Sequence, residues 1–155
     1  MRGKRAKKRL VIPDPIYKSK SIMRMINVVM QGGKKSTAEK IVYEALAKLS
    51  DDRKEAMRIF DQALKNVLPM QEVRSRRVGG ATYQVPYPLR HDRAEALAIR
   101  WLVRAAKKKQ GTDMVTRLHK ELKDAYDGIG DAIRKRDETH KSAESNRAFA
   151  HFARF

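Results

Sequence analysis

The chain has 155 residues, no cysteine, and 36 lysines and arginines against 18 acidic residues, which gives a formal net charge of +18. The absence of cysteine excludes disulfides and thiolate metal sites and fits a reducing cytosol, while no apolar run approaches the ~18 residues that a membrane span needs. Because a compact domain gains no stability from so much self-repulsion, the charge indicates a polyanionic partner such as a nucleic acid. The length predicts one domain over residues 1–155.

Residues 1–18 are predicted to form a basic N-terminal tail. Six basic residues and no acidic residue lie between positions 2 and 9, so this stretch cannot pack on itself and should become ordered only on phosphates. Pro13 and Pro15 exclude an early helix, and the apolar run before Pro13 is too short for a secretory signal. The candidate phosphate-binding residues of the tail are Arg2, Lys4, Arg5, Lys7, Lys8 and Arg9.

Apolar spacing predicts three helices in the first half of the chain. The first runs from about Ser19 or Ser21 to Gln31 and ends at the glycine pair 32–33. The second begins at Ser36, which we expect to act as the N-cap of a Ser-x-x-Glu capping box. The third begins near Asp52 and ends at Pro69. The predicted buried residues are Ile22, Met25, Ile26, Val29 and Met30, then Ala38, Ile41, Val42, Ala45, Leu46 and Leu49, then Ile59, Phe60, Ala63, Leu64, Val67 and Leu68.

Residues 72–86 predict a β-hairpin, because two extended runs flank Gly79-Gly80, a pair suited to a type I′ turn. Neither face is apolar enough to lie on a core, so we expect the hairpin to project from the body and to need a partner, since an isolated hairpin is marginal in water. The predicted cross-strand pairs are Arg76 with Tyr83, Arg74 with Val85, Arg77 with Thr82, and Ser75 with Gln84.

The arginine run on this hairpin is the sharpest candidate binding feature of the sequence. Arg74, Arg76 and Arg77 surround a glycine tip, and arginine side chains match phosphates in a bidentate manner. Tyr83 has two open interpretations, since it could stack on a nucleic-acid base or simply cover Arg76. The predicted tip consists of Arg76, Arg77, Val78, Gly79, Gly80, Ala81, Thr82 and Tyr83.

Three further helices are predicted in the second half of the chain. Asp92 should cap the fourth, with Glu95 in a capping-box position, and Thr112 should cap the fifth after Gly111 ends the fourth. Trp101 has core spacing, which we favour over base stacking. The predicted buried residues are Ala94, Leu97, Ala98, Trp101, Leu102 and Ala105, then Val115, Leu118, Leu122, Ala125 and Ile129. The basic ridge predicted along the fourth helix consists of Arg93, Arg100, Arg104 and Lys107.

Residues 131–147 predict a sixth helix that is polar nearly all round, which indicates an outside partner. It carries Lys135 and Arg136 among its basic residues, and residues 148–155 form a C-terminal tail with interleaved aromatics. The predicted fold class is mainly α: a six-helix bundle with one protruding β-hairpin and basic N-terminal and C-terminal extensions. Charge is segregated, because residues 37–72 hold seven acids and six bases. The second and third helices therefore resemble scaffold, and the remainder a binding surface.

The segment Gly32-Gly33-Lys34-Lys35-Ser36 only partly matches a nucleotide-binding P-loop. The motif needs an earlier glycine, a preceding strand and a single lysine before the hydroxyl residue. We instead expect the N–H groups at the start of the second helix, with both lysines, to hold one phosphate. The four histidines lack metal-site spacing, and the carboxylates are interpreted as helix caps, so we expect no metal and no cofactor.

The hairpin sequence from Glu72 to Pro86 resembles the signature of bacterial small-subunit ribosomal protein seven. Residues 33–38, 97–102 and 148–151 resemble further segments of that family in the right order, so the resemblance covers nearly the whole chain. It implies six helices with one β-hairpin, no enzymatic activity and no membrane association. It also implies a cytoplasmic, structural role in the small ribosomal subunit.

The resemblance also implies particular partners. These are the 3′ major domain of small-subunit ribosomal RNA, messenger RNA and exit-site tRNA near the hairpin tip, and ribosomal protein eleven together with other head proteins. An early role in organising the head is implied as well. The full set of predicted RNA-binding residues is Arg2, Lys4, Arg5, Lys7, Lys8, Arg9, Lys34, Lys35, Ser36, Arg74, Arg76, Arg77, Arg93, Arg100, Arg104, Lys107, Met114, Lys135 and Arg136.

Two other functions compete with a structural RNA-binding role. A DNA-binding regulator would concentrate its basic residues on one recognition helix, whereas here they are spread over the tail, the hairpin and two distant helices. An RNA-processing enzyme would need a carboxylate, histidine or metal cluster in a pocket, and the sequence suggests none. Competition between ribosomal RNA and duplex DNA would separate the first two hypotheses.

Overall fold

The computed structural model describes residues 3 and 10–154, and these form a mainly helical protein with one antiparallel hairpin. The predicted fold class is therefore confirmed. The elements are α1 (Lys20–Val29), α2 (Lys35–Ala47), α3 (Arg53–Val67), β1 (Gln71–Val78), β2 (Ala81–Pro88), α4 (His91–Lys108), α5 (Met114–Tyr126), α6 (Asp131–Ser145) and the short 3-10 helix η1 (Arg147–Arg154).

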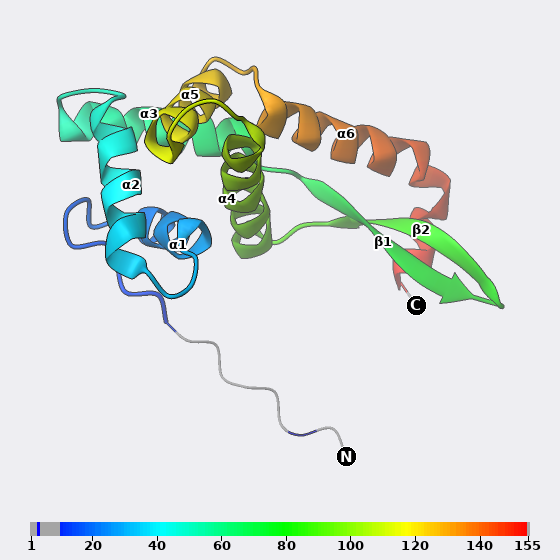
Figure 1. Cartoon of the computed structure of the whole chain (residues 1–155). Coiled ribbons are helices and arrows are strands. Elements are labelled where there is room, and N and C mark those ends of the chain that lie inside the picture. The colour runs from blue at the N-terminus through cyan, green and yellow to red at the C-terminus, as the bar shows by residue number, and fades with distance from the viewer. Residues whose placement is uncertain (1–2, 4–9, 155) are drawn as a thin grey trace.

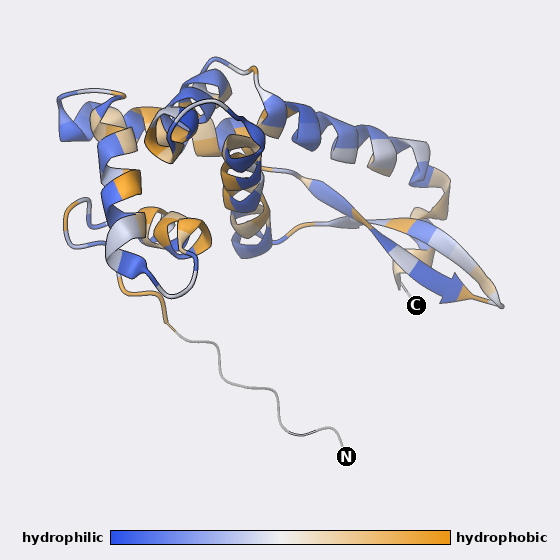
Figure 2. Ribbon diagram, viewed as in Figure 1, coloured by the Kyte–Doolittle hydropathy of each residue, from blue (hydrophilic) through white to orange (hydrophobic). Residues whose placement is uncertain are grey.

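The helices α1 to α5 enclose the core, while α6 and the hairpin extend away from it on the side of α4 (Figure 1). Hydrophobic residues are frequent along α1, α3, α4 and α5, and α6 is largely hydrophilic (Figure 2). Phe60, Leu102 and Leu118 are completely buried at the centre of this core. Most of the apolar residues predicted to be buried are buried or half-buried, as their helical spacing indicated.

Three of the predicted helix caps are wrong. Helix α2 begins one residue before Ser36 and has Lys34 at its N-cap position, with no side-chain cap. Helix α4 begins after Arg90, so Asp92 lies inside its first turn and caps nothing. The cap of α5 is Asp113, which accepts a hydrogen bond from the Thr116 backbone at 3.3 Å, and not Thr112. Asp52 does cap α3, as predicted.

The buried face of α4 is wider than its spacing predicted, because the helix lies between the core and α6. Ile99, Val103 and Ala106 are buried although they were not predicted, whereas Leu97 and Trp101 are only half-buried. Glu95 is also buried and forms an ion pair with Arg24 of α1. A capping role was predicted for Glu95; its carboxylate instead joins two helices, since a buried charge needs a charged partner.

Residue Ile129 was predicted to continue the buried face of α5, and this is wrong. Helix α5 ends at Tyr126, and Ile129 lies in the following loop with 59% of its surface exposed. Gly128 and Gly130 on either side of it adopt positive φ angles, +77° and +102°, which break the helical spacing. Gly130 then precedes the first residue of α6.

The hairpin has the predicted register, with Arg76 opposite Tyr83 and Arg74 opposite Val85. The prediction that the hairpin needs an outside partner is wrong for part of its length, because that part packs on residues of the same chain. Val85 is completely buried, and η1 lies against β2. The C-terminal segment expected to be an extension is therefore a short helix that covers one side of the hairpin (Figure 1).

The aromatic residues of η1 explain this packing. The ring of Tyr83 lies 5.2 Å from that of Phe149 and 5.1 Å from that of Phe152, measured between centroids. Arg76 donates a hydrogen bond to the Phe152 carbonyl. Tyr83 thus contacts aromatic residues of its own chain, an interaction that neither of the two predicted interpretations included, because the C-terminal residues are more than sixty positions away.

The segment before α1 is anchored by Asp14. This buried carboxylate accepts hydrogen bonds from the backbone of Ile16 (3.0 Å) and Tyr17 (2.9 Å) and from the Tyr43 hydroxyl of α2. The Tyr43 pKa is raised, first by burial and then by this contact. The last part of the predicted tail, from Asp14 onward, therefore packs on the body. The predicted phosphate-binding residues Arg2, Lys4, Arg5, Lys7, Lys8 and Arg9 lie outside the described residues.

Candidate RNA interface

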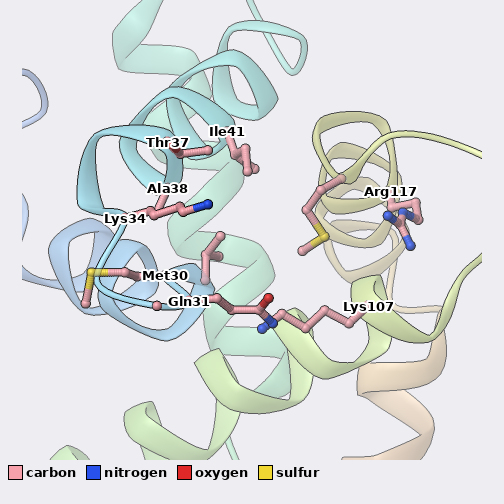
Figure 3. Close-up of a pocket in the computed structure, with 11 residues that line it drawn as sticks. Met30, Gln31, Lys34, Thr37, Ala38, Ile41, Lys107 and Arg117 are labelled. Carbon is pink, nitrogen blue, oxygen red and sulfur yellow. The ribbon is translucent and has the colours of Figure 1, made fainter.

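A hollow of about 640 Å³ brings together basic residues from three helices (Figure 3). Lys34 lies at the start of α2, Lys107 in the last turn of α4, and Arg117 in α5. Met114, another predicted site residue, lines the same hollow, and Ile41 contributes to its apolar wall. Residues more than eighty positions apart in the sequence therefore share one concave surface.

The positive charge of this hollow is not neutralised by the chain itself. Among the described residues, no carboxylate lies within 4.0 Å of the charged atoms of Lys34, Lys107 or Arg117. Arg117 donates to the backbone carbonyl of Lys109 at 2.6 Å, which orients its guanidinium and leaves its charge uncompensated. A phosphate is the natural ligand for such a set of cations. Arg117 was not predicted, because it lies outside the ridge of α4.

The ridge of α4 divides into two functional parts. Arg93 bonds with Glu72 of β1 at 3.2 Å, so it fastens the base of the hairpin to α4. Arg100 and Arg104 are exposed and have no ion pair among the described residues. The helical spacing correctly placed these residues along one helix, but it could not distinguish the arginine that meets a buried carboxylate.

A second basic hollow lies between α4 and α6. Arg104 and Lys135, both predicted, line it together with Lys108 and Arg134, which were not among the predicted site residues. The four-residue spacing from Arg104 to Lys108 could have identified Lys108. Arg136 points elsewhere, because it bonds with the Asn66 carbonyl and with Asp137 at 2.6 Å.

The hairpin arginines also differ in what they contact. Arg74 forms an ion pair with Glu72, and Arg76 bonds with the carbonyl of Phe152. Arg77 has no ion pair among the residues that the structure describes. Gly79 and Gly80 have φ angles of +57° and +90°, as a type I′ turn requires, so the chain turns tightly there. Of the predicted tip residues, Arg76 and Tyr83 contact η1, and the glycine turn lies beyond them.

Comparison with known proteins decides the family. The family model described as Ribosomal protein S7p/S5e matches residues 1–147. The chain belongs to this family. Three relatives named small ribosomal subunit protein uS7 cover nearly the full length: 52% identity in Pelagibacter ubique (97% of each chain), and 53% in Kosmotoga olearia (98% of this chain, 99% of the relative) and in Acidithiobacillus ferrooxidans (97% of each).

Membership of the family establishes the general role of the chain. It is a protein of the small ribosomal subunit that binds small-subunit ribosomal RNA, takes part in translation and works in the cytoplasm. Proteins of this family are structural components and not enzymes. Within residues 3 and 10–154, no three His, Cys, Asp or Glu side chains are grouped so as to hold a metal ion, and no helix is long and apolar enough to cross a membrane.

Proposed function

We propose that this protein binds the 3′ major domain of small-subunit ribosomal RNA and helps to organise the head of the subunit. Binding would use several dispersed surfaces: the basic residues near the N-terminus, the hollow around Lys34, Lys107 and Arg117, the exposed ridge of α4, and α6. Such a distribution suits recognition of phosphates and RNA shape across several helices, rather than the reading of one base sequence.

The observation that carries this proposal is the first hollow. Three uncompensated cations from α2, α4 and α5 meet there, and each is placed by a different part of the fold. Folding would gain nothing from bringing three like charges together, so their convergence supports an external anion. The backbone N–H groups at the uncapped start of α2 add partial positive charge to the same place.

A binding assay can test the choice of RNA domain. The protein is titrated with separately transcribed 3′ major and 5′ domains of small-subunit ribosomal RNA at physiological salt. We expect the 3′ major domain to bind at least about ten-fold more tightly, which corresponds to ~1.4 kcal/mol. Reversing the charge of the hollow with Lys107→Glu should weaken this complex by a similar factor.

The matched control for this variant is Arg58→Glu. Arg58 is exposed on α3, in the part of the chain with almost no net charge, and its loss should leave RNA affinity nearly unchanged. Equal binding of the two RNA domains would refute the proposed domain. Equal effects of the two charge reversals would refute the proposed role of the hollow.

We further propose that the hairpin tip lies near the messenger exit and the exit-site tRNA, with ribosomal protein eleven as a neighbour. The tip is turned away from the helical core, and Arg77 there is available for phosphates. The chain has no cysteine, so Ala81→Cys creates a unique thiol at the tip. A photo-crosslinker on this thiol in reconstituted subunits should capture messenger RNA, tRNA or protein eleven. Crosslinks only to distant ribosomal RNA would refute the proposed location.

A further inference from the structure

A groove between α4 and α6 has an aromatic residue at its centre. Trp101 is half-buried and lines two adjoining hollows of about 270 and 260 Å³. Lys135 and Glu138 of α6 also line both hollows, so the two are parts of one groove. The groove continues to Glu72 and Val73 at the base of the hairpin. Trp101 was predicted to be a core residue, but only part of it packs against the core.

The part of the groove beside Trp101 is basic. Four cationic side chains line it, against the two carboxylates of Asp131 and Glu138. Those carboxylates each pair with a neighbour on α6 at 3.0 Å, Arg134 and Lys135 respectively. The other two cations, Arg104 and Lys108 of α4, have no carboxylate within 4.0 Å in the part of the chain that the structure describes. They are therefore available to an anion that enters beside the indole.

We propose that this groove holds one unpaired RNA nucleotide, whose base stacks on Trp101 while Arg104 and Lys108 contact its phosphates. The proposal rests on the RNA-binding function above and assigns a nucleotide subsite to it. Aromatic side chains next to basic residues are the usual platform for unpaired bases, which expose the flat faces that a duplex hides. The hollow beside Arg104 and Lys108, at about 270 Å³, lies just below the ~300 Å³ lower end of small-molecule pockets, which suits one planar base.

An acidic peptide is the competing occupant, and the groove fits it less well. Asp131 and Glu138 would repel peptide carboxylates, whereas they can accept hydrogen bonds from the N–H groups of a base. Nothing in a glutamate side chain would use the aromatic surface of Trp101. The mixed rim, with cations on α4 and paired charges on α6, therefore favours a nucleotide, which has both anionic and hydrogen-bond-donating parts.

The fluorescence of Trp101 offers a direct test, because it is the only tryptophan of the chain. The full-length protein is titrated at low salt with three probes: a uridine hexanucleotide, the same backbone without bases, and a hexaglutamate peptide. Stacking predicts saturable quenching by the uridine probe alone. Equal quenching by the abasic probe would show a phosphate site without stacking, and equal quenching by the peptide would show a peptide site. Either result, or no quenching at all, would overturn the proposal.

Variants then separate stacking from charge, with affinity measured on a labelled uridine hexanucleotide. Trp101→Leu should weaken binding by about five-fold or more, while Trp101→Phe should keep most of the affinity. Arg104→Ala should weaken binding, and Arg58→Ala on α3 should not. Circular dichroism checks that each variant is folded; if Trp101→Leu fails this check, the comparison of Trp101→Phe and Arg104→Ala with the parent protein still decides.

Binding of the 3′ major RNA domain is measured on the same variants. If that binding is intact in the parent protein but the hexanucleotide never quenches Trp101, the nucleotide site is refuted while the proposed function stands. If the parent protein fails to bind the RNA domain and yet the hexanucleotide quenches Trp101, the proposed RNA domain is wrong, whereas the proposed nucleotide site in the groove stands.

Discussion

The carboxylate of Glu121 is completely buried, and it joins three helices. One oxygen accepts a hydrogen bond from the Ala132 backbone at the start of α6 (3.0 Å), and the other lies 2.7 Å from the ammonium group of Lys109, just after α4. The side chain itself belongs to α5. Gly130 is required beside it, since a Cβ there would lie 3.2 Å from a Glu121 oxygen and 3.0 Å from the Asp124 Cβ. This contact therefore determines where α6 leaves the bundle.

Replacing Glu121 by alanine should destabilise the protein by about 3 kcal/mol, the lower end of the range for breaking a buried ion pair, because Lys109 keeps Asp124 as a partner. Denaturant unfolding measures the loss. Glu138→Ala removes an exposed carboxylate of α6 and should cost less than about 1 kcal/mol. Similar values for the two variants would show that the buried contact contributes little.

The stability of the fold should also depend on the half-buried His119. Its pKa is lowered, first by burial and then by the nearby charge of Lys123, against an opposing contact from the Ala45 backbone. As the pH falls, His119 of the unfolded chain therefore takes up a proton near its ordinary pKa of about 6.5, before His119 of the folded protein does. The contribution of neutral His119 to the free energy of unfolding is fully present above that pH, and it is lost as the pH drops toward the lower pKa of the folded protein.

Unfolding free energies measured between about pH 7 and pH 5.5 should show this decline in the parent protein. His119→Gln should flatten the dependence, because the group that titrates differently in the two states is gone. His91→Gln, at an exposed position, should leave it unchanged. An identical slope in all three proteins would mean that other groups control the pH dependence.

At the scale of elements, the hairpin is stabilised by the end of the same chain. Tyr83, Phe149 and Phe152 form an aromatic cluster between β2 and η1, and Glu72 links β1 to α4 through Arg93. A two-stranded hairpin is marginal by itself, so these contacts hold it at a defined angle. The tip beyond them has only the ladder and its glycine turn.

Replacing both Phe149 and Phe152 by alanine should therefore loosen the hairpin and spare the helices. Each aromatic contact is worth about 0.5–1.5 kcal/mol, so hydrogen exchange of the hairpin amides should accelerate by about ten-fold or more. The amides of α1 to α5 should exchange as before. Ala150→Ser, at an exposed position of η1, is the control. Unchanged exchange in the hairpin would show that β1 and β2 are stable without η1.

At the scale of the whole molecule, charge and core occupy different regions. Residues 37–72, which include α3 and all but the first two residues of α2, hold seven acids and six bases, so the remaining segments carry the whole positive excess. This excess is not needed to neutralise the core, because each buried carboxylate that the structure describes already has a partner side chain within the protein. The excess positive charge is therefore free to act on RNA.

This distribution predicts a strong salt dependence of RNA affinity. With about six to ten phosphate contacts, the logarithm of the association constant should fall with the logarithm of salt concentration at a slope of magnitude about 4–7. Filter binding over a range of salt concentrations measures it. Deleting residues 2–9, which hold six of the cations, should reduce the slope and leave the melting temperature nearly unchanged. A slope near zero for the full chain would contradict electrostatic binding.

The sequence by itself determined the helices, the hairpin register and the need for an anionic partner. Helical spacing, a glycine pair and net charge act locally or in sum, so they can be recognised without coordinates. The resemblance of residues 72–86 to the ribosomal family was equally visible, and the family match confirmed it. Helix starts were less certain, because Ser36, Asp92 and Thr112 are suitable caps by type but lie one or more positions from the true ones.

Only the tertiary structure decided which basic residues face outward together. Arg93 and Arg76 were indistinguishable from Arg104 by sequence, yet the first two bind groups of their own chain. Arg117 and Lys107 became neighbours only when α4 and α5 packed against each other, and Trp101 became half-exposed only where α6 leaves α4. Pairings over such separations depend on how the helices pack, and local sequence patterns carry no information about that packing.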